Sequence, residues 1–125
     1  MQNKAKILII DDEEDICHFS KSILEKTGKF EVMTAMRPMT GINLAKLNKP
    51  DLVLLDLFMP EMDGSKVAEH LLNNEITKDI PIVFLTALVK DQDVQKDGKI
   101  AGRMFIPKPV ASEELVAKVS ALLHI

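Results

Sequence analysis

Acidic, hydroxyl and basic side chains stand at the ends of four short apolar runs in this 125-residue chain. They are Asp11 with Asp12, Asp56, Thr86 and Lys108. A short apolar run without alternation is typical of a strand buried on both faces, as in a parallel sheet covered by helices. The carboxyl ends of such strands lie at the edge where open α/β folds place their ligands. We therefore expect these side chains to converge on one site.

The chemistry of such a site follows from its charges. Three carboxylates in a partly desolvated site repel each other, and a divalent cation and the Lys108 ammonium can relieve that repulsion. An all-oxygen set with several carboxylates suits Mg²⁺, which keeps waters and accepts phosphate oxygens. The Thr86 hydroxyl could hydrogen-bond a further oxygen anion, and an Asp carboxylate can form an aspartyl-phosphate. The pattern predicts a site that holds a phosphoryl group beside Mg²⁺, with Asp56 as acceptor.

The rest of the chain alternates between strand-like and helix-like patterns. The predicted strands are Lys6–Ile10, Phe30–Ala35, Asp51–Asp56, Ile80–Thr86 and Met104–Ile106. The predicted helices are Glu14–Thr27, Pro38–Leu47, Gly64–Asn74 and a last helix that Ser112 N-caps. Strict alternation favours a parallel sheet with helices on both faces. We therefore expect one α/β domain over residues 1–125, a doubly wound, five-stranded parallel sheet.

A fifth helix is expected between residues 89 and 103, where the chain reads VKDQDVQKDGKIAGR. Its apolar positions are sparse, and Gly98 and Gly102 each cost about 1 kcal/mol relative to alanine in a helix. We expect a short helix here that is poorly packed or mobile.

Helical spacing predicts which side chains face the sheet. They are Ile16, Phe19, Ile23 and Leu24; Met39, Ile42 and Ala45; Val67, Ala68, Leu71 and Leu72; and Leu115, Val119, Leu122 and Leu123. Met33, Met36 and Met39 are spaced closely enough to suggest a soft-metal site, but they straddle a strand–helix junction. Core packing is therefore the favoured interpretation for these methionines.

Composition limits the classes of function. A net charge of −3, with 46% hydrophobic and 28% charged residues, is typical of a soluble globular protein. Tryptophan and tyrosine are absent and the charges are mixed, so the sequence offers neither a basic surface nor an aromatic platform for nucleic acid. No apolar run approaches the ~20 residues of a membrane span, and the start lacks a secretory signal pattern. These features favour the cytoplasm.

The cysteine and histidines are interpreted as structural or surface residues. The single Cys17 cannot form an internal disulfide, and it is placed on a helix face with no basic neighbour to lower its pKa. The histidines show no metal-ligand spacing and are assigned to helix surfaces. They are His18, His70 and His124.

Four motifs give the chain a family resemblance. They are IIDDEED (Ile9–Asp15), LVLLDLFMPEMDG (Leu52–Gly64), IVFLTA (Ile82–Ala87) and FIPKPV (Phe105–Val110). In this order and spacing, from Lys6 to Leu123, the chain resembles the receiver domain of two-component response regulators, in the class of the single-domain chemotaxis regulator. The resemblance implies the flavodoxin-like strand order 2-1-3-4-5.

The resemblance also implies a role for each site residue. Asp56 would be the phosphoacceptor, and the Mg²⁺ ligands would be Asp11, Asp12, Asp56 and the backbone carbonyl of Phe58. Thr86 and Lys108 would hold the phosphoryl oxygens, and Phe105 would be an aromatic rotamer switch. The Lys108–Pro109 peptide bond would be cis.

A receiver domain implies partners rather than a substrate. The phosphoryl donor would be a sensor histidine kinase or a phosphotransfer protein, and the output would go to an effector protein or to an output domain absent from these residues. The domain would assist its own phosphorylation and dephosphorylation but would not be a turnover enzyme, and it would bind neither nucleic acid nor membrane directly. The sequence leaves open the cognate kinase, the signal, whether the domain stands alone, and whether phosphorylation drives dimerisation.

Three positions depart from the family pattern. Ala101-Gly102 replaces the usual Gly-Ala pair, which predicts a reduced output face resting on the last strand and helix. Phe58 and Leu88 place apolar bulk two residues after Asp56 and Thr86, which predicts slow loss of the phosphoryl group. The alternative function is a small Mg²⁺-dependent aspartyl-phosphate phosphohydrolase, but such enzymes carry a second Asp where this chain has Phe58.

Overall fold

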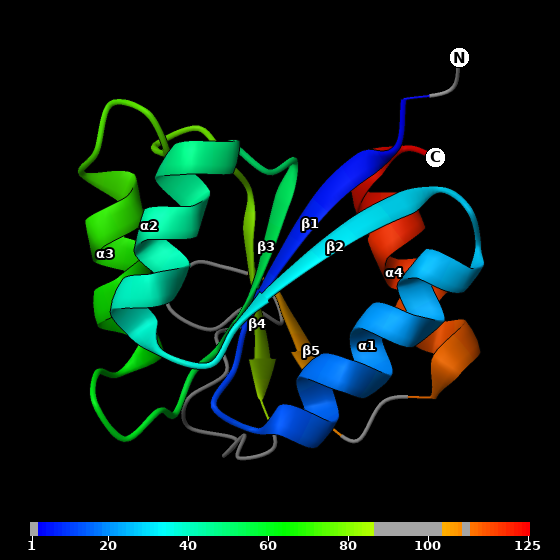
Figure 1. Ribbon diagram of the computed structural model, residues 1–125, viewed down its shortest axis with the longest axis horizontal. Coiled ribbons are helices and arrows are strands. Elements are labelled where there is room, and N and C mark those ends of the chain that lie inside the picture. The colour runs from blue at the N-terminus through cyan, green and yellow to red at the C-terminus, as the bar shows by residue number, and fades with distance from the viewer. Residues whose placement is uncertain (1–2, 87–103, 109–110) are drawn as a thin grey trace.

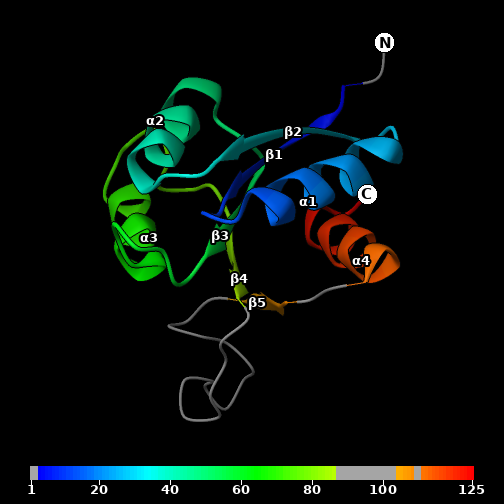
Figure 2. The same cartoon turned by 60° about the horizontal axis from the view of Figure 1, so that its bottom comes forward.

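The computed structural model describes residues 3–86, 104–108 and 111–125. The strands are β1 (Ala5–Ile10), β2 (Phe30–Ala35), β3 (Leu52–Asp56), β4 (Ile82–Thr86) and β5 (Phe105–Pro107), and the helices are α1 (Glu14–Lys26), α2 (Pro38–Asn48), α3 (Gly64–Leu72) and α4 (Ser112–Leu123). All strand pairs are parallel and the order is β2-β1-β3-β4-β5. Helices α2 and α3 cover one face and α1 and α4 the other (Figure 1; a second view is given in Figure 2). The predicted fold and strand order are confirmed.

The sheet divides the core into two apolar clusters, which explains the continuous apolar runs. In β1, Leu8 and Ile10 pack towards α2 and α3, whereas Ile7 and Ile9 pack towards α1 and α4. All four side chains are fully buried. Burial of a side chain of this size contributes about 1.5–3 kcal/mol, so both faces of the strand stabilise the fold.

The strand register brings the ends of the central strands level with one another. Ile10 pairs with Leu55, so the residues that follow, Asp11 and Asp56, come out of the sheet side by side. Asp56 in turn pairs with Leu85 on β4, directly before Thr86. Thr86 pairs with Pro107 on β5, directly before Lys108. The register alone therefore gathers the predicted site residues at one edge.

Helix α1 is rotated relative to the prediction. Its buried residues are Cys17, Ser20 and Leu24, whereas Phe19 is 39% exposed. Cys17, Ser20 and Leu24 share one face at spacings of three and four, and Phe19 lies about 200° around the helix from Cys17. The inward placement of Phe19 was wrong, because the small side chains of Cys17 and Ser20 pack against the sheet instead.

Three further apolar side chains are more exposed than predicted. Met36, Met39 and Leu72 are 45%, 50% and 51% exposed. Met36 precedes α2, Met39 lies in the first turn of α2, and Leu72 is the last residue of α3. Core packing was therefore wrong for Met36 and Met39, while Met33 does pack against the core.

The start of α4 also differs from the prediction. Ala111 is the N-cap residue, and its carbonyl accepts a hydrogen bond from the backbone N–H of Leu115 (3.0 Å). Ser112 is the first helical residue, so its assignment as N-cap was wrong. Leu115 and Val119 are fully buried, and their packing sets the start of the helix more strongly than cap preference does.

Some predictions fall outside the described residues. They are the helix between 89 and 103, the positions of Leu88 and Ala101-Gly102, and the peptide bond to Pro109. Within the described ranges, no helix combines the length and apolar character needed to cross a membrane.

Candidate functional site

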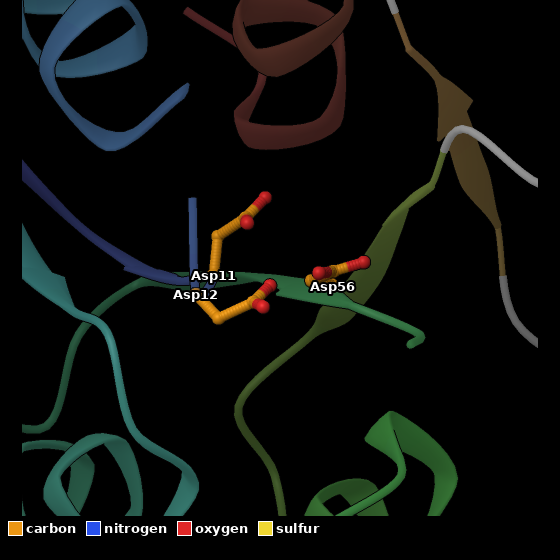
Figure 3. Close-up of side chains that lie close together, drawn as sticks. All are labelled: Asp11, Asp12 and Asp56. Atoms are coloured by element: carbon orange, nitrogen blue, oxygen red, sulfur yellow. The ribbon is translucent and has the colours of Figure 1, made fainter. Parts of the chain in front are cut away.

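Three carboxylates gather where β1 and β3 end. One carboxylate oxygen from each of Asp11, Asp12 and Asp56 lies within 4.8 Å of the other two (Figure 3). Asp11 and Asp56 are buried, with 0% and 4% of their surface exposed, and Asp12 is half-buried. The structure therefore brings together the acids that the sequence predicted to converge.

Asp11 is held by hydrogen bonds from three directions. Its N–H donates to the carbonyl of Ala35 (3.0 Å), which ties it to the end of β2. The N–H of Glu13 donates to its Oδ1 (2.9 Å), and the Cys17 thiol donates to its carbonyl (3.3 Å). Two of these bonds hold the backbone of Asp11, and the bond from Glu13 orients its carboxylate.

Asp56 is positioned by the loop that follows it. Its Oδ1 accepts a hydrogen bond from the N–H of Phe58 (3.2 Å), and the N–H of Gly64 donates to the carbonyl of Leu57 (2.8 Å). A Cβ at position 64 would lie 2.7 Å from the Cα of Leu57 and closer still to the Asp56 carbonyl. Gly64 is therefore required for α3 to begin against the backbone of the acceptor residue. Asp63 caps that helix by accepting from the N–H of Ser65 (2.8 Å).

Lys108 brings positive charge to the cluster. Its N–H donates to the carbonyl of Thr86 (2.8 Å), which anchors it to the end of β4. Its ammonium lies 2.6 Å from Oδ2 of Asp11, 3.0 Å from Oε1 of Glu13 and 3.8 Å from Oδ1 of Asp56. Only 6% of the Lys108 side chain is exposed. The lysine therefore lies inside the site, in direct contact with Asp11 and within reach of Asp56.

Burial and crowding shift the ionisation of these groups. Burial, reinforced by the charge of Asp11, raises the pKa of Asp56 to about 7, although Lys108 opposes the shift. Burial also raises the pKa of Asp11 above its ordinary value, again against the effect of Lys108. Burial by itself would lower the pKa of Lys108, but its bonds to Asp11 and Glu13 outweigh this and raise it. One ammonium thus compensates only part of the negative charge.

The donor set fits a hard divalent cation. All three clustered side chains offer oxygen, which is the ligand atom that Mg²⁺ prefers. The buried Oδ2 of Asp11 has the Lys108 ammonium, at 2.6 Å, as its partner among the described residues. A cation at this point would relieve the repulsion between Asp11 and Asp56, which adds to the effect of burial in raising the pKa of Asp56.

The other predicted residues lie where the sequence placed them, and their roles stay predictions. Thr86 is fully buried at the end of β4. Phe105 is half-buried on β5, where it pairs with Phe84 and packs against the core. The Phe58 side chain is 49% exposed in the loop after β3.

Two residues near the site were not assigned correctly from sequence. Glu13 falls within the IIDDEED motif but was given no role, and it forms an ion pair with Lys108. Cys17 does have a basic neighbour, since the charge of Lys108 acts to lower its pKa, but burial dominates and raises that pKa to about 11. The buried thiol donates a hydrogen bond to the carbonyl of Asp11. The spacing of residues in the sequence does not indicate the direction in which the Glu13 side chain points, so its pairing with Lys108 could not be predicted.

The histidines are exposed, as predicted. Among the residues that the structure describes, the only cluster of three or more potential metal ligands is Asp11, Asp12 and Asp56.

Comparisons with known proteins agree with this geometry. The family model for the response regulator receiver domain matches residues 7–120. The chain is 39% identical over 119 residues to the DNA-binding dual master transcriptional regulator RpaA of Synechocystis, covering 95% of this chain and 49% of that protein. It is 36% identical over 121 residues to Protein PilH of Pseudomonas aeruginosa, covering 95% of this chain and 98% of that protein. The chain thus spans about half the length of the transcriptional regulators it matches first and nearly all of PilH.

Solved structures give the same result. The crystal structure of a two-component response regulator from Clostridium difficile superposes with a TM-score of 0.83 at 31% identity, over 97% of both chains. Fold, site geometry and sequence similarity therefore agree along almost the whole chain.

Proposed function

Because the chain belongs to the response regulator receiver domain family, we propose that it is a phosphorylation-controlled switch of two-component signalling, with Asp56 as the phosphoacceptor. The observation that carries the proposal is the convergence of Asp11, Asp12, Asp56 and Lys108 at one edge of the sheet. Of the three acids, Asp56 comes from the central strand, and the Lys108 ammonium lies 3.8 Å from its carboxylate, close enough to contact the oxygens of a phosphoryl group on Asp56.

The transfer is written as a displacement at phosphorus. A carboxylate oxygen of Asp56 attacks the phosphorus of a phosphohistidine, a P–O bond forms and the P–N bond breaks. The electron pair of the broken bond stays on the imidazole, which leaves and takes up a proton from solvent. The Lys108 ammonium stabilises the negative charge on the phosphoryl oxygens. Positive charge also keeps Asp56 ionised, which matters because a protonated carboxyl is a poor nucleophile.

Mg²⁺ is the proposed cofactor. Asp11, Asp12, Asp56 and the backbone carbonyl of Phe58 would hold it. When bound, the ion offsets the charge of the carboxylates and of the phosphoryl oxygens. The fit of the oxygen donor set and the raised pKa of Asp56 support this assignment.

The switch itself is proposed to run through Thr86 and Phe105. A phosphoryl group adds about −1.5 to −2 charges at neutral pH, by analogy with phosphate monoesters, and the Thr86 hydroxyl would move to hydrogen-bond it. Phe105 would follow into the vacated space and alter the outer face of β5 and α4.

The proposed partners are a sensor histidine kinase or a phosphotransfer protein on the input side and an effector on the output side, in the cytoplasm. The alternative, a phosphohydrolase, is disfavoured because Phe58 occupies the position of the second acid that such enzymes use. The domain would therefore catalyse its own modification and its reversal but no turnover of a separate substrate.

Small-molecule phosphorylation tests the proposal. The protein is incubated with acetyl phosphate and Mg²⁺, and intact mass is measured for wild type, Asp56→Asn and Asp79→Asn, an exposed control. Wild type and Asp79→Asn should gain one phosphate, and Asp56→Asn should gain none. An undiminished adduct in Asp56→Asn would refute the role of Asp56, and labelling that survives removal of Mg²⁺ would refute the metal assignment.

A further inference from the structure

The ammonium of Lys108 is held mainly by residues other than the acceptor. It lies 2.6 Å from Asp11 and 3.0 Å from Glu13, but 3.8 Å from Asp56. The last distance is too long for a hydrogen bond. In the unphosphorylated protein, the group expected to meet the phosphoryl oxygens is therefore already paired with two other carboxylates.

The conformation of Glu13 shows that its side chain does not serve the helix that it precedes. Glu13 is the N-cap residue of α1, with φ −90° and ψ 110°, and within the described structure its side chain forms no capping hydrogen bond. N-cap positions favour Ser, Thr, Asp and Asn, whose short side chains reach the first helical N–H groups. When a residue at a functional site departs from such a local sequence preference, the departure indicates a functional role for that residue. Here the carboxylate turns to Lys108 instead.

We propose that Glu13 is a positioning residue that holds the Lys108 ammonium on the Asp11 side of the site and so limits the affinity for a phosphoryl group on Asp56. The inference rests on the proposed function. Its physical basis is competition, because an ammonium already paired with two carboxylates attracts a further anion less strongly. Of the two partners, Asp11 is fully buried, whereas 57% of the Glu13 side chain is exposed. Glu13 is therefore the partner that can release Lys108 when the phosphoryl group arrives.

A phosphoryl analogue tests the inference without turnover. Beryllofluoride mimics an acyl phosphate when it binds a carboxylate, and its binding at saturating Mg²⁺ is followed by ¹⁹F NMR, since the chain has no tryptophan to report it. Glu13→Gln keeps the shape of the side chain and removes its charge. The interaction free energy of a half-exposed ion pair is small, so the loss of the Glu13 charge should have a modest effect on affinity. Glu13→Gln should therefore bind beryllofluoride about 2- to 5-fold more tightly than wild type.

Glu14→Gln is the matched control. It removes the same charge from the adjacent exposed residue in the first turn of α1. If net charge alone mattered, the two variants would behave alike. Glu14→Gln should instead bind beryllofluoride with the affinity of wild type.

Two further measurements separate positioning from stability. Glu13→Asn offers a better N-cap, so it should be at least as resistant to urea as wild type while still binding the analogue more tightly. In the ligand-free protein, the side-chain ammonium signal of Lys108 in ¹⁵N NMR should show faster hydrogen exchange in Glu13→Gln but not in Glu14→Gln. If Glu13 had a purely structural role, Glu13→Asn would not bind beryllofluoride more tightly while resisting urea as well as wild type. Nor would the Lys108 ammonium exchange hydrogen faster in Glu13→Gln.

The outcomes distinguish the inference from the function on which it rests. If wild type binds beryllofluoride and Glu13→Gln binds it equally or more weakly, the positioning role is overturned and the proposed function stands. If wild type does not bind the analogue at all, the proposed function fails and the inference fails with it.

Discussion

Removal of the Asp56 charge should stabilise the metal-free protein, although Asp56 is the residue on which function depends. The carboxyl is 4% exposed, and its pKa rises from 3.8 to about 7, first because of burial and then because of the charge of Asp11. That is about three pKa units, and each unit corresponds to about 1.36 kcal/mol. Ionised Asp56 therefore destabilises the folded state by an amount of order 4 kcal/mol. Asparagine removes this charge and can still accept the hydrogen bond from the N–H of Phe58.

The pH dependence has a defined sign. Between about pH 4 and pH 7 the folded state binds more protons at Asp56 than the unfolded state, so the stability of wild type falls as pH rises through this window. The advantage of Asp56→Asn should be close to zero near pH 4 and complete above about pH 7. Because Asp11 and Asp56 interact, the observed titration belongs to the pair.

Urea unfolding with a chelator present, at pH 5 and pH 8, provides the assay. Asp79→Asn is the control, because it makes the same substitution at an exposed position outside the site. Asp56→Asn should unfold at a higher urea concentration than wild type, and by a larger margin at pH 8. An Asp56→Asn protein that is no more stable than wild type at pH 8, or whose advantage does not grow with pH, would refute the electrostatic reasoning.

Three further predictions concern the same edge of the sheet. Mg²⁺ should raise the free energy of unfolding of wild type by about 2.7 kcal/mol at one hundred times its dissociation constant, and should raise that of Asp11→Asn much less; equal shifts in urea unfolding would count against Asp11 as a ligand. Gly64→Ala should lose of order 1–3 kcal/mol in the same assay, because the added Cβ meets the backbone of Leu57, and unchanged stability would show that α3 can move away. Phe58→Asn should shorten the lifetime of the phosphorylated protein several-fold, followed by intact mass, because the apolar ring no longer hinders water; an unchanged lifetime would remove Phe58 from that role.

Much of the site could be predicted because it depends on strand ends rather than on side-chain detail. A strand buried on both faces is a continuous apolar run, and its end is the first polar residue, so Asp11 and Asp56 were identified without structural information. The parallel register then makes their convergence a consequence of topology. Thr86 and Lys108 follow by the same argument on β4 and β5.

What could not be predicted depends on how each helix meets the sheet. Phe19 lies outside because α1 is rotated to bring Cys17 and Ser20 inward. Periodicity gives the spacing of the residues on a helix face, but it does not determine which face packs against the sheet. The pairing of Glu13 with Lys108 joins residues 95 positions apart. It depends on the direction of one flexible side chain, and no local pattern encodes that direction.

The position of the phosphoryl group is the most direct test of the central claim. Wild type is phosphorylated with acetyl phosphate and Mg²⁺ and then treated with borohydride, which reduces an aspartyl-phosphate to homoserine. Peptide mass spectrometry then locates the reduced residue. We predict homoserine at position 56 and unmodified aspartate at positions 11 and 12. Homoserine at either of those positions, with intact aspartate at 56, would contradict the account.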